Sequence, residues 1–173
     1  MSAAARNRTG TVAPAFERLD ADDLPGLLGL ERHGFGPGER WSADSWRAEL
    51  AGPGRLCLGL RGGDGLVAAG IIGVLFEDAE LLRIVVAPPA RGRRVATGLL
   101  AGLMAAAAGR GAERMLLDVR RDNGAALALY GRAGFIRIAV RENYYGPGAD
   151  ALVLEAAVRP RGSAAGAAEG GRP

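Results

Sequence analysis

The chain has 173 residues, a length typical of one domain with a sizeable hydrophobic core. Its 22 basic and 19 acidic residues leave a net charge of +3, and without a dense cationic block this balance argues against direct nucleic-acid binding. A single cysteine excludes an internal disulfide framework, and the lack of a long apolar run argues against a membrane span. We therefore expect a cytoplasmic protein.

The N-terminal half is predicted to form a strand, two helices and a three-stranded meander. Asp20 and Ser42 are good helix N-caps, and Gly62–Gly65 favours a tight hairpin. Cys57 lies in an apolar strand pattern, where a buried hydrophobic role is a better interpretation than a catalytic thiol. Strands are expected at 14–19, 55–61, 66–76 and 79–86, helices at 22–32 and 43–50, and a flexible tail at 1–13.

The C-terminal half is predicted to alternate helices and strands. Leucines and alanines recur at helical spacing after an arginine-rich loop, and Gly109 and Gly111 end that helix. Strands are expected at 114–120, 135–143 and 151–158, a short helix at 123–132 and a flexible tail at 159–173. The predicted fold class is α/β (α+β), as one domain over residues 14–158. Its mixed sheet has about seven strands, antiparallel in the first half, and about four helices.

The segment after the strand at 79–86 has features of a phosphate-binding loop. Pro88 and Pro89 cannot continue a strand ladder. The backbone N–H groups of Gly92–Thr97 are expected in a turn and the first turn of a helix, where amide donors lack internal partners and attract anions. Arginines at 91, 93 and 94 add positive charge. From the residues alone, a phosphate site and an arginine-rich surface loop both remain open.

Three polar residues stand out in the next strand and helix. Asp118 alternates with the apolar Leu117 and Val119 and so projects from the opposite face of the strand. Asn123 is a favourable helix cap, and Tyr130, two helical turns later, lies nearly on the same face. Each has a purely structural alternative when taken singly. Asp118 could pair with Arg120 or Arg121, Asn123 could be only a cap, and Tyr130 could be a core phenol.

Together these segments resemble the GNAT superfamily of N-acetyltransferases, whose acetyl-CoA signature is Gln/Arg-x-x-Gly-x-Gly/Ala. Arg91 and Ala96 match its first and last positions, and Arg94 replaces the middle glycine. The resemblance covers about residues 15–158 and is strongest between 79 and 151. Similarity to the ribosomal-protein-alanine N-acetyltransferase branch, the RimI type, is carried by residues 118–135, 141–145 and 150–151.

The resemblance implies an acetyl-CoA site in a splayed sheet. In it, Ile84, Val85 and Val86 would lie beside the acetyl-pantetheine arm. The residues that would hold the pyrophosphate and add charge are Arg91, Gly92, Arg93, Arg94, Val95, Ala96 and Thr97.

The resemblance also implies catalytic and acceptor residues. Tyr130 would be the general acid for the leaving thiolate, and Asp118, where the family has a glutamate, would be the general base. Asn123 would bind the pantetheine arm or orient the acceptor. Tyr144 and Tyr145 would wall the acceptor groove, with an aromatic hairpin corner as the alternative.

The implied activity is transfer of acetyl from acetyl-CoA to a protein N-terminal α-amine, by direct attack in a ternary complex. The specific acceptor implied is the N-terminal alanine of a small-subunit ribosomal protein. Two alternatives stay open: acetylation of a small-molecule amine, and a catalytically weakened CoA-binding sensor. No His/Cys/Asp cluster has metal-ligand spacing, so no metal is expected. No membrane partner is expected, and the protein is expected to be a monomer or weak dimer.

Overall fold

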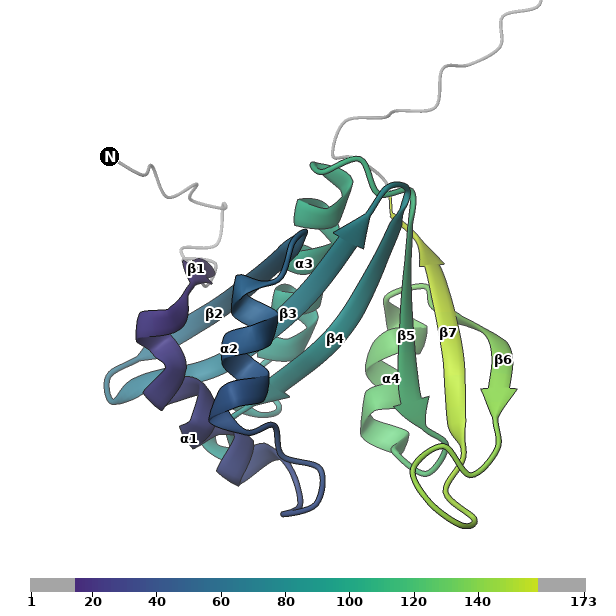
Figure 1. Cartoon of the computed structure of the whole chain (residues 1–173), viewed down its shortest axis with the longest axis horizontal. Coiled ribbons are helices and arrows are strands. Elements are labelled where there is room, and N and C mark those ends of the chain that lie inside the picture. Colours follow the sequence, from purple (N-terminus) through teal and green to yellow (C-terminus); the bar gives the residue numbers. More distant parts are fainter. Residues whose placement is uncertain (1–14, 159–173) are drawn as a thin grey trace, which may run out of the picture.

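The computed structural model describes residues 15–158, which form one seven-stranded mixed sheet and four α-helices (Figure 1). The predicted α/β class, mixed sheet and helix number are confirmed, whereas the predicted tails, 1–13 and 159–173, lie outside the described residues. The strand order is β1-β2-β3-β4-β5-β7-β6. The strands are β1 (Glu17–Leu19), β2 (Arg55–Gly62), β3 (Gly65–Leu75), β4 (Asp78–Val86), β5 (Arg114–Arg120), β6 (Ile136–Arg141) and β7 (Ala151–Ala157). The helices are α1 (Leu24–Gly34), α2 (Ala43–Ala51), α3 (Val95–Ala108) and α4 (Gly124–Arg132).

The first helix begins two residues later than predicted. Asp20 caps a short 3-10 turn, Ala21–Asp23, through a hydrogen bond from the Asp22 N–H to its carboxylate. Pro25 lies in the first turn of α1, where its missing N–H costs nothing. The proline therefore fixes the start of the α-helix at Leu24. Ser42 caps α2 as predicted, with its hydroxyl accepting from the Ser45 N–H at 3.1 Å.

Strands β2, β3 and β4 form the predicted antiparallel meander. Gly62 pairs with Gly65, so a two-residue turn joins β2 to β3. The β3–β4 register shifts between Ile71 and Ile72, which leaves Leu82 as an extra residue in β4. Such a bulge bends a strand and increases its twist. The bulge lies two residues after Glu80, the last residue of β4 that pairs with β5.

Two hydrophobic layers pack on opposite faces of the β1–β4 part of the sheet. Helices α1 and α2 cover one face, and α3 lies behind the other, where α4 covers β5 (Figure 1). Cys57 is 3% exposed in the α1–α2 layer, and burial raises the pKa of its thiol to about 12. This confirms its interpretation as a buried hydrophobic residue rather than a reactive thiol.

Strands β4 and β5 separate soon after they meet. They pair in parallel only from Asp78 to Glu80 and from Arg114 to Leu116. Beyond these positions β5 pairs with β7 on its other side and β4 pairs with β3. The sheet is thus splayed, as predicted, between the C-terminal halves of β4 and β5. Backbone groups point alternately to the two sides of a strand, so part of the polar backbone of β4 faces this gap.

Candidate active site

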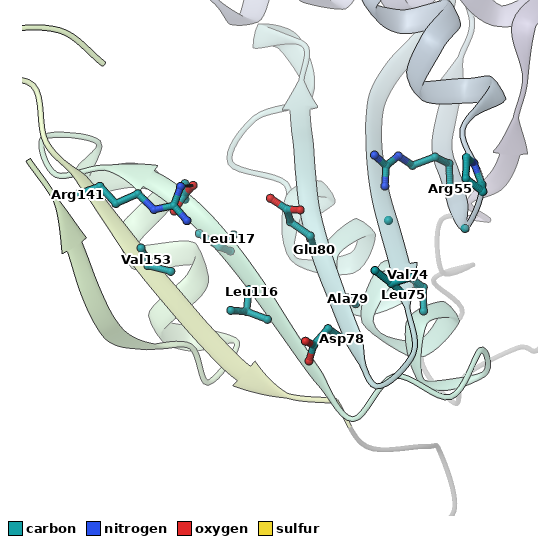
Figure 2. Close-up of a pocket in the computed structure, with 14 residues that line it drawn as sticks. Arg55, Val74, Leu75, Asp78, Ala79, Glu80, Leu116, Leu117, Arg141 and Val153 are labelled. Carbon is teal, nitrogen blue, oxygen red and sulfur yellow. Dashed lines mark ion pairs between the residues drawn. The ribbon is translucent and has the colours of Figure 1, made fainter. Parts of the chain in front are cut away.

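A groove of about 600 Å³ runs across the sheet face that carries α1 and α2 (Figure 2). We call it the open groove. It extends from Pro53 and Gly54, after α2, over β4 and β5 to Arg141 on β6. Figure 1 shows that α1 and α2 stop short of the β5–β7–β6 part of this face. The other lining residues are Arg55, Gly73, Val74, Leu75, Asp78, Ala79, Glu80, Leu116, Leu117, Asp118 and Val153.

Asp118 lines the open groove from β5, on the opposite face to Leu117 and Val119, as its alternation predicts. Its side chain is 18% exposed, and Oδ2 lies 3.3 Å from an Nη atom of Arg141. Oδ1 is buried and has no hydrogen-bond partner among residues 15–158. A buried carboxylate oxygen without a donor is costly, so this atom is suited to accept a hydrogen bond from a bound molecule. The alternative of an ion pair with Arg120 or Arg121 is wrong, because these arginines pair with Asp122 and Asp150.

Glu80 is a second groove-lining carboxylate, which the sequence analysis did not single out. It extends into the groove from β4, opposite Arg141 (Figure 2). Its signal in the sequence is the same as that of Asp118, since it alternates with the buried Ala79 and Leu81. Glu80 stands at the last paired position of β4 and β5, whereas Asp118 lies two residues further, beside the gap. Asp118 is therefore closer to the splayed region.

Tyr130 lies on α4, on the other side of the sheet from the open groove. Its ring is 6% exposed and packs against Phe135, with 5.6 Å between the ring centroids. Burial, followed by the nearby Tyr145, raises the pKa of the Tyr130 hydroxyl to about 12. The phenol therefore keeps its proton near neutral pH. It is packed in the core, as the structural alternative requires, and it is also a group able to donate a proton.

Asn123 is the N-cap of α4, as predicted. Its Oδ1 accepts the N–H of Ala126 at 3.1 Å. The cap therefore engages the side-chain oxygen, while the amide N–H₂ group stays available to another acceptor. Among residues 15–158, the Asn123 side chain makes this one hydrogen bond.

The arginine-rich loop leads into α3 in the predicted way. A 3-10 turn over Pro88–Ala90 ends β4, and the first α-helical bond runs from the Gly98 N–H to the Arg94 carbonyl. The N–H groups of Val95, Ala96 and Thr97 thus lack helical acceptors and point out of the helix start. Gly92 has φ of +73° with no atom within 4 Å of a would-be Cβ, so the loop is open at this point. These features fit an anionic phosphate group.

Arg94 has φ of +60° and ψ of +16°, the left-handed conformation that favours glycine. Arg94 therefore has a backbone conformation that glycine adopts without strain, at the position where the signature has a glycine. Arg91 is turned back toward the fold, with Nε donating to the Val86 carbonyl at 3.0 Å and Nη2 to the His33 carbonyl at 3.3 Å. Arg93 is exposed. The three arginines thus have different surroundings.

The three predicted thioester-side residues end β4 beside the gap. Val85 faces the α1–α2 layer, while Ile84 and Val86 pack toward α3. Their partners on β3 are Ala68, Ala69 and Gly70. The other edge of this stretch has no partner strand among the described residues, which leaves its outward backbone groups free for a ligand.

Tyr144 and Tyr145 lie in the loop between β6 and β7, with ring centroids 5.0 Å apart in an edge arrangement. Both are exposed, Tyr144 to 53% and Tyr145 to 39%. Burial, and then the negative charge of Asp118, raises the pKa of the Tyr145 hydroxyl. Asp118 and Tyr145 thus lie on the open-groove side of the sheet, whereas Tyr130, Asn123 and the loop 91–97 lie on the α3–α4 side.

Within residues 15–158 no helix is long and apolar enough to cross a membrane. In the same part of the chain, no group of three His, Cys, Asp or Glu side chains is arranged to hold a metal ion.

Residues 16–135 match the Acetyltransferase (GNAT) family. The chain is 33% identical over 129 residues to the [ribosomal protein bS18]-alanine N-acetyltransferase of Salmonella typhimurium, covering 73% of this chain and 84% of that protein. It is 37% identical over 150 residues to an uncharacterised protein of Mycobacterium leprae, of whose length it spans 39%.

The crystal structure of the ribosomal-protein-S18-alanine N-acetyltransferase from Escherichia coli superimposes with a TM-score of 0.76 at 26% identity. The match covers 87% of this chain and 97% of that one. The family match spans the splayed strands, the loop before α3 and α4. The chain is an acetyl-CoA-dependent N-acetyltransferase that belongs to the Acetyltransferase (GNAT) family.

Proposed function

We propose that the chain transfers acetyl from acetyl-CoA to the N-terminal α-amine of a protein, specifically to an N-terminal alanine of a small-subunit ribosomal protein. The acceptor is suggested by the names of the similar Salmonella and Escherichia coli proteins. The observation that carries the proposal is Asp118. It presents a buried oxygen without a partner to the open groove, beside the gap between β4 and β5.

The proposed reaction uses both faces of the splayed sheet. The acceptor amine lies in the open groove, and acetyl-CoA lies on the α3–α4 side with its thioester in the gap. Asp118 accepts a proton from the attacking amine, directly or through water. Tyr130, with its pKa raised to about 12, donates its proton to the sulfur of the departing CoA. An α-amine has a pKa of about 7.7–8.0, so part of it is already neutral near pH 7.

The cofactor residues have separate roles in this proposal. The N–H groups of Val95, Ala96 and Thr97 bind the pyrophosphate together with the loop at Gly92. Arg93 and Arg94 add positive charge, and Arg91 fixes the loop to Val86. The gap-facing backbone of Ile84–Val86 holds the thioester and pantetheine arm. The free amide group of Asn123 reaches the same arm. Tyr144 and Tyr145 wall the acceptor side.

The test is an acetylation assay with an alanine-starting peptide, the same peptide blocked at its N-terminus, and a set of polyamines. We expect release of CoA thiol with the free peptide, and mass spectrometry should place the acetyl group on the α-nitrogen. The blocked peptide is the matched control for internal side chains. Thiol release with polyamines alone would favour a small-molecule acceptor. Binding of acetyl-CoA without thiol release for any amine would support the CoA-sensor alternative.

A further inference from the structure

The loop between α1 and α2, residues 35–42, is fixed to the sheet by a buried ion pair. Glu31, on α1, is 1% exposed. Its two carboxylate oxygens accept from Nε and Nη2 of Arg83, on β4, at 3.0 and 2.6 Å. Glu31 Oε2 also accepts the backbone N–H of Trp41 at 3.0 Å. One buried carboxylate thus joins α1, β4 and the far end of the loop.

Arg83 also holds the middle of the loop. Its guanidinium lies 3.5 Å from the ring centroid of Phe35 and 5.0 Å from that of Trp41. Nη2 donates to the backbone carbonyl of Glu39 at 2.5 Å. A planar guanidinium can make bidentate and stacked contacts together, which a lysine cannot. The backbone of Glu39 is therefore held in place while its carboxylate stays exposed.

The Glu39 carboxylate reaches across the splayed sheet. Its Oε1 lies 3.3 Å from an Nη atom of Arg120, which is 81 residues away in sequence, at the end of β5. Arg120 follows Asp118 on the same face of β5, just beyond the end of the open groove at which Asp118 lies. Since β4 and β5 do not pair here, this ion pair ties the two sides of the gap together.

Arg120 is held independently of Glu39. Its Nε and Nη2 each donate a hydrogen bond of 3.0 Å to the Asp122 carboxylate. Its guanidinium also lies 5.6 Å from the ring centroid of Tyr145. The Glu39–Arg120 pair therefore links the loop 35–42 to the proposed acceptor wall. The side chains of Glu39 and Arg120 are 45% and 35% exposed, so the pair is weak and sensitive to salt.

We propose that the Glu39–Arg120 ion pair is a latch that holds the loop 35–42 against the end of β5, next to the acceptor end of the open groove, and that Arg83 is the positioning residue that presents Glu39 to Arg120. The proposal rests on the proposed function for the identity of the acceptor. The latch keeps the loop in one position before the peptide arrives, so that less conformational freedom is lost when the peptide binds. It acts on acceptor binding and leaves acetyl-CoA binding, on the other face, unchanged.

The test compares Glu39→Gln with Asp44→Asn. The control removes the same charge from an exposed ion pair that stays on one side of the gap, Asp44–Arg47 at 2.9 Å within α2. Hydrogen exchange of the loop 35–42 is measured in the full chain without substrates. We expect exchange about two- to fivefold faster in Glu39→Gln at low salt, since an exposed pair contributes up to about 1 kcal/mol. Wild type and Asp44→Asn should remain alike, and the difference should vanish near 1 M salt.

The kinetic part measures KM for the alanine-starting peptide and for acetyl-CoA. In Glu39→Gln we expect a peptide KM raised about two- to fivefold at low salt, with acetyl-CoA KM and kcat unchanged. Equal loop exchange in wild type and Glu39→Gln would overturn the latch whatever the activity. Faster exchange with an unchanged peptide KM would overturn its role in acceptor binding. If wild type acetylates no peptide, the proposed function fails, while the exchange measurement still decides whether the loop is tied to β5.

Discussion

Asp118 and Glu80 line the same groove in different surroundings. The Asp118 side chain is only 18% exposed and forms an ion pair with Arg141. One of its carboxylate oxygens, Oδ1, has no hydrogen-bond partner among residues 15–158. Glu80 is exposed at the last position where β4 and β5 pair. A base must lie within reach of the proton it removes. The position of Asp118 beside the gap, where the thioester is proposed to lie, therefore favours it over Glu80.

We expect Asp118→Asn to lower kcat by about 100-fold or more, because general base catalysis typically contributes that much. Acetyl-CoA affinity, measured by calorimetry, should not change, since Asp118 lies on the opposite face from the loop 91–97. Glu80→Gln is the matched control and should lose much less activity. A larger loss in Glu80→Gln than in Asp118→Asn would move the general base to β4.

For Tyr130→Phe we expect a large decrease in kcat with acetyl-CoA binding retained. Its raised pKa of about 12 favours the neutral phenol, so the wild-type enzyme should keep its acid up to about pH 10. The wild-type rate should rise as the acceptor amine loses its proton and then stay level, without an alkaline decline. Tyr145→Phe makes the same chemical change on the acceptor side and should raise peptide KM instead. Wild-type turnover in Tyr130→Phe would remove Tyr130 from the mechanism.

Local sequence patterns predicted the faces on which single residues lie. Strand alternation placed Asp118 opposite its apolar neighbours, and helix capping rules identified Ser42 and Asn123. Partners far apart in the sequence could not be predicted in this way. The pairing of Asp118 with Arg141 depends on the register of β5, β7 and β6, and no local pattern encodes that register.

At the scale of elements, the start of α3 is the feature on which cofactor binding is proposed to depend. The left-handed residue that begins it is Arg94, where a side chain costs about 1 kcal/mol relative to glycine. The sequence predicted the helix and its open N–H groups, because prolines and helical spacing are local signals. It did not predict the conformation of Arg94, because arginine has no preference for that region.

We expect Arg94→Gly to raise the free energy of unfolding by up to about 1 kcal/mol, because glycine adopts positive φ without strain. Arg93→Gly is the matched control. It removes the same charge from the adjacent position, which is outside the left-handed region, and should lower stability by about 0.5–1 kcal/mol. Thermal unfolding measures the stability of both variants relative to wild type, and we expect an increase for Arg94→Gly and a decrease for Arg93→Gly. A decrease in stability for both would show that Arg94 is not strained.

Element boundaries were less predictable than the elements themselves. The strand expected at 135–143 ends at Arg141, because Asn143 turns with φ of +54° and its side chain accepts the Gly148 N–H at 2.6 Å. The first helix begins at Leu24 because Pro25 occupies its first turn. In both cases a specific local contact, rather than hydrophobic periodicity, decides where the element stops.

At the scale of the whole molecule, the Glu31–Arg83 pair joins a helix, a strand and a loop in the α1–α2 layer. Both residues lie next to apolar residues in the sequence. A charged residue in such a segment is the one local sign that it could be buried with a partner of opposite charge. Breaking such a pair from one side leaves an uncompensated buried charge, which costs more than the intact pair contributes.

We expect Arg83→Met to lower the free energy of unfolding by about 3 kcal/mol or more, because Glu31 then stays buried without its cation. Glu31→Met combined with Arg83→Met should recover much of this loss, since neither charge remains. Arg47→Met, which breaks the exposed Asp44 pair, should change stability by about 0.5 kcal/mol or less. Denaturant unfolding measures all three. An additive loss in the double variant would contradict the argument.

The short β4–β5 ladder has a consequence for how the chain is made. Every residue of β1–β4 and α1–α3 precedes every residue of β5–β7 and α4, so each part of the sheet is continuous in the sequence. Synthesis from the N-terminus delivers the first part complete before β5 leaves the ribosome. Strand β4 is then the edge to which β5 is added, and the backbone ladder between the two parts has three residue pairs. The separation that opens the active site also lets the two parts of the sheet form one after the other during translation.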